Sequence, residues 1–464
     1  MKTGTGRRVV VVGAGITGLT TAHRLMVDRP GLETTVMESA PVAGGRLVTT
    51  PFAGLPVDEG ADSFLTRVPW ATDLCAELGL SDELVSPSAR SASLWLDEQL
   101  RPIPDGSVLG LPLDPATVQP GLLPEADLER LAGPGIPDRP LPAGDGPAGD
   151  LSIGEVIRSC VGPGVLERLV DPLLGGVNAG MADEMSCALM APQFLRAARS
   201  DEGLLATLRL AAAEADPTTP VFAAHPAGMA HLVATLVGRL GERIRTNQRV
   251  LTIAADGDTW RIGLDNGTET ADAVVVATPA PVAARLVDAA CPEAATTLRG
   301  IRHASVSLAA IAYRRSDLGE RGVQGVCIVC GGWGRWTSGC ACGGRRGRRL
   351  DAGGDTILRV SAGRIDDDRS SHMDDDTLVA SLRRELSTTL GVEADPTAVR
   401  VTRWPDSLAQ FPVGHRRQMA EMLLTLSHDA PGLFVTGSAH NGVGIPACVR
   451  SGNDAAAAVS ELLG

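Results

Sequence analysis

The sequence has little aromatic content and no long apolar run. Six Trp, six Phe and a single Tyr, Tyr313, are all that it holds of these side chains in 464 residues. No window approaches the roughly 18 uninterrupted apolar residues of a membrane-spanning helix, so we expect no transmembrane segment. Positive charge is outnumbered: 42 Lys and Arg stand against 55 Asp and Glu, for a net charge of −13. That balance argues against nucleic acid and against an anionic membrane surface as partners.

Signs of secretion are missing as well. The nine cysteines are an odd number with five scattered singly, which is typical of reduced thiols rather than of a disulfide framework. The chain enters an apolar strand after eight residues and then a glycine-rich loop, which leaves no room for a signal peptide. With 44% hydrophobic residues, the chain can build ample interior and suits two or three domains. We therefore expect a soluble, cytoplasmic protein.

Motifs for catalysis by side chains are also missing. There is no HExxH sequence, no credible nucleophile triad and no Cys/His pair at a useful spacing. We interpret the eight dispersed histidines as packing or surface residues, and His440, beside a turn discussed below, is the one that we would test. Catalytic side chains therefore stay unassigned, and we expect no metal ligands.

A glycine-rich turn near the N-terminus is the strongest positive signal. Residues 9–12 are four consecutive valines, the pattern of a buried parallel strand, and Gly13, Gly15 and Gly18 follow in GxGxxG spacing. The first glycine permits a tight turn, the second lets a pyrophosphate approach the backbone, and the third lets the next helix pack against the strand. The amides at the N-terminus of that helix favour an anion.

An acidic residue completes this unit. A second strand over residues 34–37 ends at Glu38, twenty residues after the last glycine. A carboxylate at this place accepts hydrogen bonds from ribose hydroxyls and disfavours a 2′-phosphate. The further "GGRL" at residues 44–47 resembles the extended fingerprint of the large flavoprotein family that includes amine oxidases, phytoene desaturases and protoporphyrinogen oxidases. The resemblance implies FAD as the cofactor, with Arg46 beside its phosphates.

Later segments resemble returns of the chain to the same fold. Residues 225–280 follow the pattern helix, strand, hairpin, strand, and Val250 is where relatives meet the adenine. Residues 431–463 read as a strand, a Val-Gly-Ile turn and a helix with Pro446 at its start, where proline is favoured. The helix N-terminus would point at the polar edge of the flavin.

These returns imply a discontinuous organisation of the α/β class. We expect a Rossmann-type FAD-binding domain from residues 1–85, 225–290 and 400–464, and an α+β substrate-binding domain from 86–224 and 291–399. Eleven prolines within residues 101–150 exclude a long helix or central strand there, whereas 151–212 follow a helical pattern.

Four motifs make the resemblance more specific. "VDEGADSFLTRVP" (57–69), "ERLVDPLLGGVNAG" (167–180), "WPDSLAQFPVGH" (404–415) and "GVGIPACVRSG" (442–452) are together similar to bacterial oxygen-dependent protoporphyrinogen/coproporphyrinogen III oxidases, over most of the chain. The Gram-positive members of this family act mostly on coproporphyrinogen III. The resemblance implies a FAD-dependent oxidoreductase that acts on CH–CH groups with O2 as acceptor. It would produce coproporphyrin III and hydrogen peroxide for haem synthesis, with transient contact to the metal-inserting chelatase.

The motifs supply the candidate site. A porphyrinogen is a broad apolar disc with propionates at its rim, so apolar walls and an arginine fork would suit it. Arg67 is the candidate substrate anchor. The candidate cofactor-binding residues are Gly13, Ala14, Gly15, Ile16, Thr17, Gly18, Glu38, Ser39, Arg46, Gly60, Ala61, Asp62, Ser63, Val250, Trp404, Val443, Gly444 and Ile445. The family usually has tyrosine where this chain has Asn178, and it often has a fuller glycine pair where only Gly228 stands here.

Three alternatives stay open at this point. One is oxidation of protoporphyrinogen IX instead, since the sequence does not separate the two porphyrinogens. A flavin amine oxidase would share the fold, but it typically cages its amine between aromatic side chains, and this chain offers a single tyrosine. An inactive homologue or a flavin- or porphyrin-binding chaperone is the non-catalytic alternative.

One segment does not fit this family. Residues 327–344, "CIVCGGWGRWTSGCACGG", carry Cys327, Cys330, Cys340 and Cys342. The family resemblance implies an apolar strand and a turn with a Lys-Trp pair here, and the sequence shows the pattern of neither. We interpret residues 322–353 as a local reading-frame error, because GC-rich codons read one base late generate Trp, Arg, Gly and Cys. Four thiolates could alternatively hold tetrahedral zinc, and a genuinely divergent loop is the third interpretation.

Overall fold

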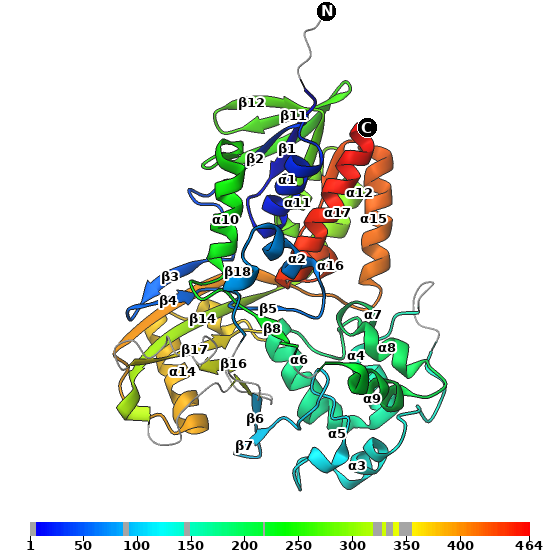
Figure 1. Cartoon of the computed structure of the whole chain (residues 1–464), viewed down its shortest axis with the longest axis vertical. Coiled ribbons are helices and arrows are strands. Elements are labelled where there is room, and N and C mark those ends of the chain that lie inside the picture. The colour runs from blue at the N-terminus through cyan, green and yellow to red at the C-terminus, as the bar shows by residue number, and fades with distance from the viewer. Residues whose placement is uncertain are drawn as a thin grey trace, which may run out of the picture.

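The computed structural model describes residues 6–86, 92–142, 149–216, 219–318 and 355–464, together with the backbone of two strands, Cys327–Cys330 and Thr337–Cys342 (Figure 1). The nucleus of the fold is a parallel sheet of five strands in the order β19-β13-β1-β2-β9. These strands are β1 (Arg8–Val12), β2 (Glu33–Met37), β9 (Ile244–Arg245), β13 (Ala273–Val276) and β19 (Leu433–Val435). Segments far apart in the sequence thus form neighbouring strands, and the expected α/β class is confirmed.

Both faces of this sheet are covered, which explains its continuous apolar strands. Val9 and Val11 pack against α1 (Ile16–Asp28), α10 (Ala230–Leu240) and α17 (Ile445–Leu463). Val10 and Val12 face the other layer. That layer holds the antiparallel sheet β10 (Val250–Asp256), β11 (Thr259–Leu264) and β12 (Gly267–Ala271), and the helices α11 (Ala280–Val287), α12 (Pro292–Arg299) and α15 (His415–Asp429). In Figure 1 these elements form the upper half of the molecule.

A second sheet of seven strands lies below the first, in the order β18-β14-β17-β16-β15-β6-β7 (Figure 1). Its strands are β6 (Ala92–Leu96), β7 (Gln99–Pro102), β14 (His303–Arg314), β15 (Cys327–Cys330), β16 (Thr337–Cys342), β17 (Asp355–Ala362) and β18 (Ala398–Ala409). Leu358 and Val360 of β17 pack against Leu378 and Leu382 of α14 (Asp375–Leu390), so one face is buried and the other is left to neighbouring elements.

The anomalous segment contributes strands to this sheet. No strand was legible from the sequence at residues 327–344, but β15 pairs with β6 and β16, and β16 pairs with β17. The backbone thus forms strands that the local sequence did not indicate, because hydrogen bonding to neighbouring strands decides the outcome more than local propensity does. The side chains there, and the remainder of residues 322–353, lie outside the described residues.

The insert between the first and second visits to the parallel sheet is mostly helical. It contains α3 (Glu125–Ala132), α4 (Ile153–Val161), α5 (Pro163–Val165), a π-helical turn (Leu166–Val170), α6 (Asp171–Asn178), α7 (Cys187–Met190), α8 (Pro192–Ala198) and α9 (Leu204–Glu214). These helices share a core of their own, to which Phe194 and Ile157 contribute fully buried side chains. As expected from its prolines, the described part of residues 101–150 holds little beyond β7, α3 and a 3₁₀ turn at Pro115–Thr117.

Short elements connect the two halves. The small pairs are β3 (Thr49–Phe52) with β4 (Leu55–Asp58), and β5 (Phe64–Leu65) with β8 (Phe222–Ala223). Helix α2 (Trp70–Glu77), a 3₁₀ turn at Ser81–Glu83, α13 (Arg369–His372) and α16 (Ser438–Asn441) complete the principal elements. Where the insert leaves and returns, Val85 and Ala224 exchange two backbone hydrogen bonds of 2.9 Å. Among the described helices, none has the length and apolar character needed to cross a bilayer.

Candidate functional site

A cavity of about 1180 Å³ opens between the two halves. It begins at the carboxyl ends of β1, β2 and β13, where Gly13, Glu38 and Ala277 line it, and it extends to the second sheet, where Arg359 and Trp404 line it. Ligands of open α/β folds bind outside the carboxyl ends of the strands. The volume lies above the range of about 300–1,000 Å³ for common small-molecule pockets. There is accordingly room for a large cofactor and a second molecule.

The glycine-rich turn forms one wall as its spacing predicts. Gly13 has a φ of +102°, and a Cβ there would lie 2.9 Å from the Ala277 carbonyl oxygen, so both conformation and space require glycine. A Cβ on Gly18 would lie 2.0 Å from the Gly13 carbonyl oxygen. A Cβ on Gly15 would meet nothing within 4 Å, since that residue faces the open cavity. Gly13 and Gly18 therefore serve the fold, whereas Gly15 keeps space for a ligand.

The "GGRL" loop packs directly on this turn. The Gly44 amide donates to the Ala14 carbonyl at 2.8 Å, and a Cβ on Gly45 would lie 3.2 Å from the Gly15 Cα. Gly44 and Gly45 both have positive φ, +132° and +58°. The two loops thus form one continuous backbone surface along the cavity, which only residues without side chains permit.

Two long helices begin at this cavity with no side-chain cap. Gly15 is the N-cap of α1 and Gly444 is the N-cap of α17, and neither has a side chain to accept from the first amides. The first residues of both helices line the cavity. Uncapped amides and the positive end of the helix dipole attract anionic or electron-rich groups. The cavity therefore offers two places for an anionic or electron-rich group, one at the N-terminus of α1 and one at the N-terminus of α17.

Glu38 lies at the end of β2, on the cavity wall. One carboxylate oxygen accepts from the Ala14 amide at 2.8 Å and the other accepts from the Ala40 amide at 2.8 Å. These bonds fix the orientation of the carboxylate and leave lone pairs for a further donor, since a carboxylate accepts about four hydrogen bonds. Ser39, Gln248 and Val250 line the cavity nearby.

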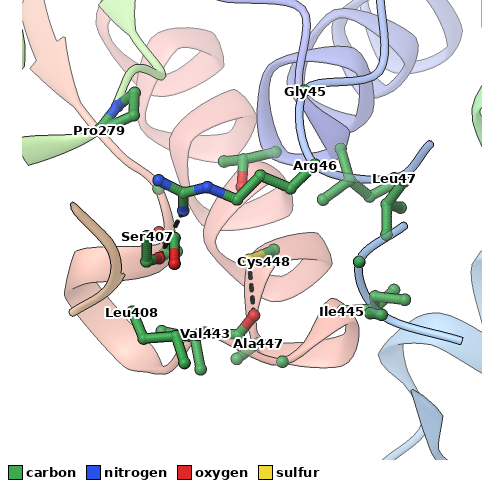
Figure 2. A pocket seen from close by; sticks show the side chains of 18 of the residues that line it. Gly45, Arg46, Leu47, Pro279, Ser407, Leu408, Val443, Ile445, Ala447 and Cys448 are labelled. Carbon is green, nitrogen blue, oxygen red and sulfur yellow. Dashed lines mark hydrogen bonds between the residues drawn. The ribbon is translucent and has the colours of Figure 1, made fainter. Parts of the chain in front are cut away.

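Arg46 reaches across the cavity wall to the second sheet (Figure 2). Its guanidinium donates to the backbone carbonyls of Ser407, at 2.6 Å, and Asp406, at 3.1 Å. Burial lowers the pKa of Arg46, yet an arginine stays charged in proteins, so the wall carries a cation here. Cys448 lies close by in the first turn of α17, where burial raises the pKa of its thiol to about 11 and keeps it neutral.

The segment from Glu59 to Ser63 forms the wall between the two halves. Side chains of the second sheet hold two successive carbonyls of it: the Trp404 indole donates to the Glu59 carbonyl at 2.6 Å, and Arg359 donates to the Gly60 carbonyl at 2.6 Å. Arg359 also forms an ion pair with Asp62. The sequence singled out Trp404 but not Arg359.

The far end of the cavity is mostly apolar. Val306 and Leu308 of β14 line it, together with the end of α6 at residues 176–179. Asn178 lines it too, with its side-chain amide donating to the Leu174 carbonyl at 2.9 Å. Tyr313 lies buried in the core between the second sheet and α14, away from the cavity. The aromatic residues among the described lining are therefore Trp70, Phe222 and Trp404.

The structure brings together most of the candidate residues. All the proposed cofactor residues line the cavity except Ala14 and Gly18, which are fully or nearly buried behind the turn. Arg67 does not: it is exposed, whereas its neighbours Leu65 and Val68 line the cavity. The loop after β5 thus directs apolar side chains inward and the arginine outward. Arg67 is therefore withdrawn as a substrate anchor.

His440 lies behind the turn and does not line the cavity. It is buried, and neither ring nitrogen has a hydrogen-bond partner among the described residues. Burial lowers its pKa to about 4, so the ring is neutral at physiological pH. It has the character of a core histidine rather than of a proton donor to a ligand.

One group of metal-ligand types occurs among the described residues, formed by Glu83, His225 and His231. The two imidazoles stack with centroids 4.0 Å apart and planes 4° from parallel. A shared ion would have to lie in the plane of both rings, which parallel rings cannot offer. Nδ1 of His225 also accepts from the Ala227 amide at 3.1 Å, so its Nε2 carries the proton directed at Glu83, 2.9 Å away. The arrangement is a stacked, hydrogen-bonded cluster, not a metal site.

Arg359 is the functional candidate that sequence reasoning missed. In strand β17 it shares a face with Ile357 and Ser361, while Leu358 and Val360 point to α14. Alternation could have identified a charged residue on the face of the strand that is turned away from α14. It could not have identified the segment that this face meets, because Gly60 and Asp62 are remote in sequence.

Comparisons with known proteins agree with this geometry. The family model described as flavin containing amine oxidoreductase matches residues 16–460. A coproporphyrinogen III oxidase of Mycobacterium tuberculosis is 33% identical over 99% of this chain and 98% of its own length. A protein of the same name from Bacillus subtilis is 28% identical over 98% of each chain. A crystal structure from Exiguobacterium sp. 255-15, provisionally named a protoporphyrinogen oxidase, superimposes with a TM-score of 0.85 at 28% identity and covers 98% of this chain and 99% of that one.

Proposed function

Because this chain belongs to the flavin containing amine oxidoreductase family, we propose that it is an FAD-dependent coproporphyrinogen III oxidase. It would oxidise coproporphyrinogen III to coproporphyrin III in haem biosynthesis. Each of three rounds removes two electrons and two protons from the macrocycle and passes them to one O2, which leaves as hydrogen peroxide. The observation that carries the proposal is the continuous cavity that joins the glycine-rich turn to an apolar chamber.

The residues present fit a flavin dinucleotide. The open space over Gly15 and the uncapped N-terminus of α1 suit a pyrophosphate, and the oriented carboxylate of Glu38 suits a ribose. Val250 lines the end of the cavity that would take the adenosine, and Val443, Gly444 and the first residue of α17, Ile445, line the other end. These two ends support FAD rather than a mononucleotide.

When bound, the flavin supplies the redox chemistry, accepting hydride from the substrate and returning electrons to O2. The tasks left to this chain are binding, orientation and exclusion of water. The α17 N-terminus favours negative charge on the polar edge of the ring system, and the segment 60–63 and Trp404 bound the cavity beside it.

The apolar chamber suits the flat face of a tetrapyrrole. Val306, Leu308 and Val177 are apolar, and no tyrosine lies in the described lining. An amine oxidase would need aromatic side chains around its amine, and the aromatic residues of the described lining come from three separate elements. This composition favours the porphyrinogen over an amine.

The test is purification followed by an absorption spectrum and side-by-side assays of coproporphyrinogen III and protoporphyrinogen IX under air. We expect a yellow protein that generates porphyrin fluorescence faster from the first substrate, with three equivalents of peroxide per porphyrin. If protoporphyrinogen IX is oxidised faster, it is the substrate instead of coproporphyrinogen III. If neither porphyrinogen is oxidised, the proposed activity is rejected. FAD, rather than FMN, should be released on denaturation.

Two further parts of the proposal concern the setting. We place the protein in the cytoplasm, where a transient contact would hand the product to the chelatase that inserts the metal. Fractionation tests the first statement. For the second, a product-transfer assay should show faster porphyrin delivery to the chelatase from this enzyme than from free porphyrin.

A further inference from the structure

Arg359 connects the second sheet to the wall of the cofactor cavity. It lies in β17, where its backbone pairs with Ala310 of β14. One terminal nitrogen donates to the Asp62 carboxylate and the other donates to the Gly60 carbonyl at 2.6 Å. The Arg359 and Asp62 side chains are only 14% and 18% exposed, so solvent screens their ion pair weakly.

These contacts hold the segment from the side of the second sheet, next to the hydrogen bond from Trp404 to the Glu59 carbonyl. Gly60 passes close to the "GGRL" loop, since a Cβ on it would lie 2.4 Å from the Arg46 carbonyl oxygen and only glycine fits there. On the opposite side, Arg359 fixes both the backbone and the side chain of the segment. All four residues from Gly60 to Ser63 line the cavity.

We propose that Arg359 and Asp62 are a positioning pair that sets segment 60–63 against the bound flavin, and that Arg359 is not an anchor for a substrate carboxylate. The identity of the bound group rests on the function proposed above. Because the pair joins the two halves of the molecule, it also sets the distance between the flavin wall and the chamber for the substrate.

The geometry disfavours the anchor role. Of the five N–H donors of Arg359, one on each terminal nitrogen is engaged within the protein, and the Nε–H is buried without a partner among the described residues, so the edge that a carboxylate fork would need at Nε is closed to solvent. A substrate propionate would have to compete with the Asp62 carboxylate, which already forms an ion pair with the guanidinium. The charge of the guanidinium is balanced by the same carboxylate.

The test compares R359A, R359K and D62N with a matched control, R383A. Arg383 forms an ion pair of 2.6 Å with Asp395 in the same half of the molecule, but it does not line the cavity. For each variant, the flavin dissociation constant is measured by titrating apoprotein, and KM and kcat are measured with both porphyrinogens. D62N removes charge without removing volume, and it serves if R359A does not fold.

We expect R359A and D62N each to weaken flavin binding about tenfold, the usual effect of losing a charged hydrogen bond. The double variant should bind flavin no more weakly than R359A, because R359A already removes the ion pair that D62N removes. R359K should restore part of the affinity, and R383A should bind flavin normally. The ratio of KM values for substrates with four and two propionates should stay unchanged.

Unchanged flavin affinity in both R359A and D62N would overturn the positioning role. A KM that rises tenfold for coproporphyrinogen III alone would instead make Arg359 an anchor. The flavin titration needs no porphyrinogen, so a protein that oxidises neither substrate would reject the proposed function and still test the pair.

Discussion

The indole nitrogen of Trp404 donates a hydrogen bond of 2.6 Å to the backbone carbonyl of Glu59. Trp404 belongs to the second sheet and Glu59 follows β4, so one side chain ties the second sheet to the cavity wall. Segments more than 300 residues apart in the chain thus share one boundary of the site.

Trp404→Phe should weaken flavin binding, because the Glu59 carbonyl loses its donor while the ring volume largely stays. We expect unfolding to become easier by about 1 kcal/mol, the net value of a typical hydrogen bond. Flavin titration and urea unfolding measure the two effects. Trp260→Phe is the matched control, since Trp260 donates to the Pro431 carbonyl at 3.3 Å but does not line the cavity. Equal loss of flavin affinity in both variants would contradict the assignment.

Gly15→Ala and Gly18→Ala should separate cofactor binding from folding. A methyl group at Gly15 enters the open cavity, so flavin affinity should fall while the apoprotein unfolds within about 0.5 kcal/mol of the parent. At Gly18 it meets the Gly13 carbonyl oxygen, so the apoprotein should lose about 3 kcal/mol or more. Urea unfolding of apoprotein and flavin titration are the measurements. A Gly15→Ala protein that binds flavin normally would show that the cofactor lies elsewhere.

His440 should make the folded state less stable as the pH falls. Burial lowers its pKa from 6.5 to about 4, so between these values the unfolded chain binds a proton that the folded chain does not. This contribution is absent above pH 6.5 and reaches about 2 kcal/mol of lost stability by pH 5, at 1.36 kcal/mol per pH unit.

The variant that tests it is His440→Leu, in which this part of the pH dependence should disappear. Urea unfolding at pH 7 and pH 5 measures it. His428→Gln is the control, because that side chain is 89% exposed. Parallel pH profiles for His440→Leu and the parent would refute the buried neutral state.

Arg67→Ala should leave turnover nearly unchanged. The side chain is exposed and does not line the cavity, so kcat/KM for coproporphyrinogen III should change less than about twofold, as for a surface substitution. Steady-state kinetics under air measure this. A tenfold loss would mean that the substrate extends out of the cavity to residue 67.

Resequencing the gene across residues 322–353 should find a shifted reading frame. The corrected translation should replace the Cys-, Gly- and Arg-rich sequence with an apolar sequence that is compatible with the strand pairing of β15 and β16. If the DNA confirms the present frame and metal analysis finds one zinc per chain, the zinc interpretation holds instead.

The parallel sheet was accessible to sequence reasoning because its signals are local. Valines 9–12, the glycine spacing and the proline at the start of α17 each follow from neighbours in the chain. The same reasoning located Trp404 through a family motif. It placed Arg67 in the site because a family motif does not tell which way a loop side chain points.

The contacts that join the two halves were not accessible. Arg359 meets Asp62 across 297 positions of the chain, and its strand follows the segment whose letters matched no pattern. The cluster of Glu83, His225 and His231 is similar, since it forms only when the insert returns beside its own starting point. Tertiary pairing of this kind leaves no period in the sequence.

The twin hydrogen bonds between Val85 and Ala224 fasten the two ends of the helical insert to each other. The length and sequence of the insert can change without displacing the strands of the nucleotide-binding sheet, because the two ends of the insert are bonded to each other. Yet it supplies residues 176–179 to the chamber wall. Grafting the equivalent insert from a relative would therefore change the chamber wall over the substrate and leave the dinucleotide-binding residues unchanged. In this way one fold could change its specificity among tetrapyrroles.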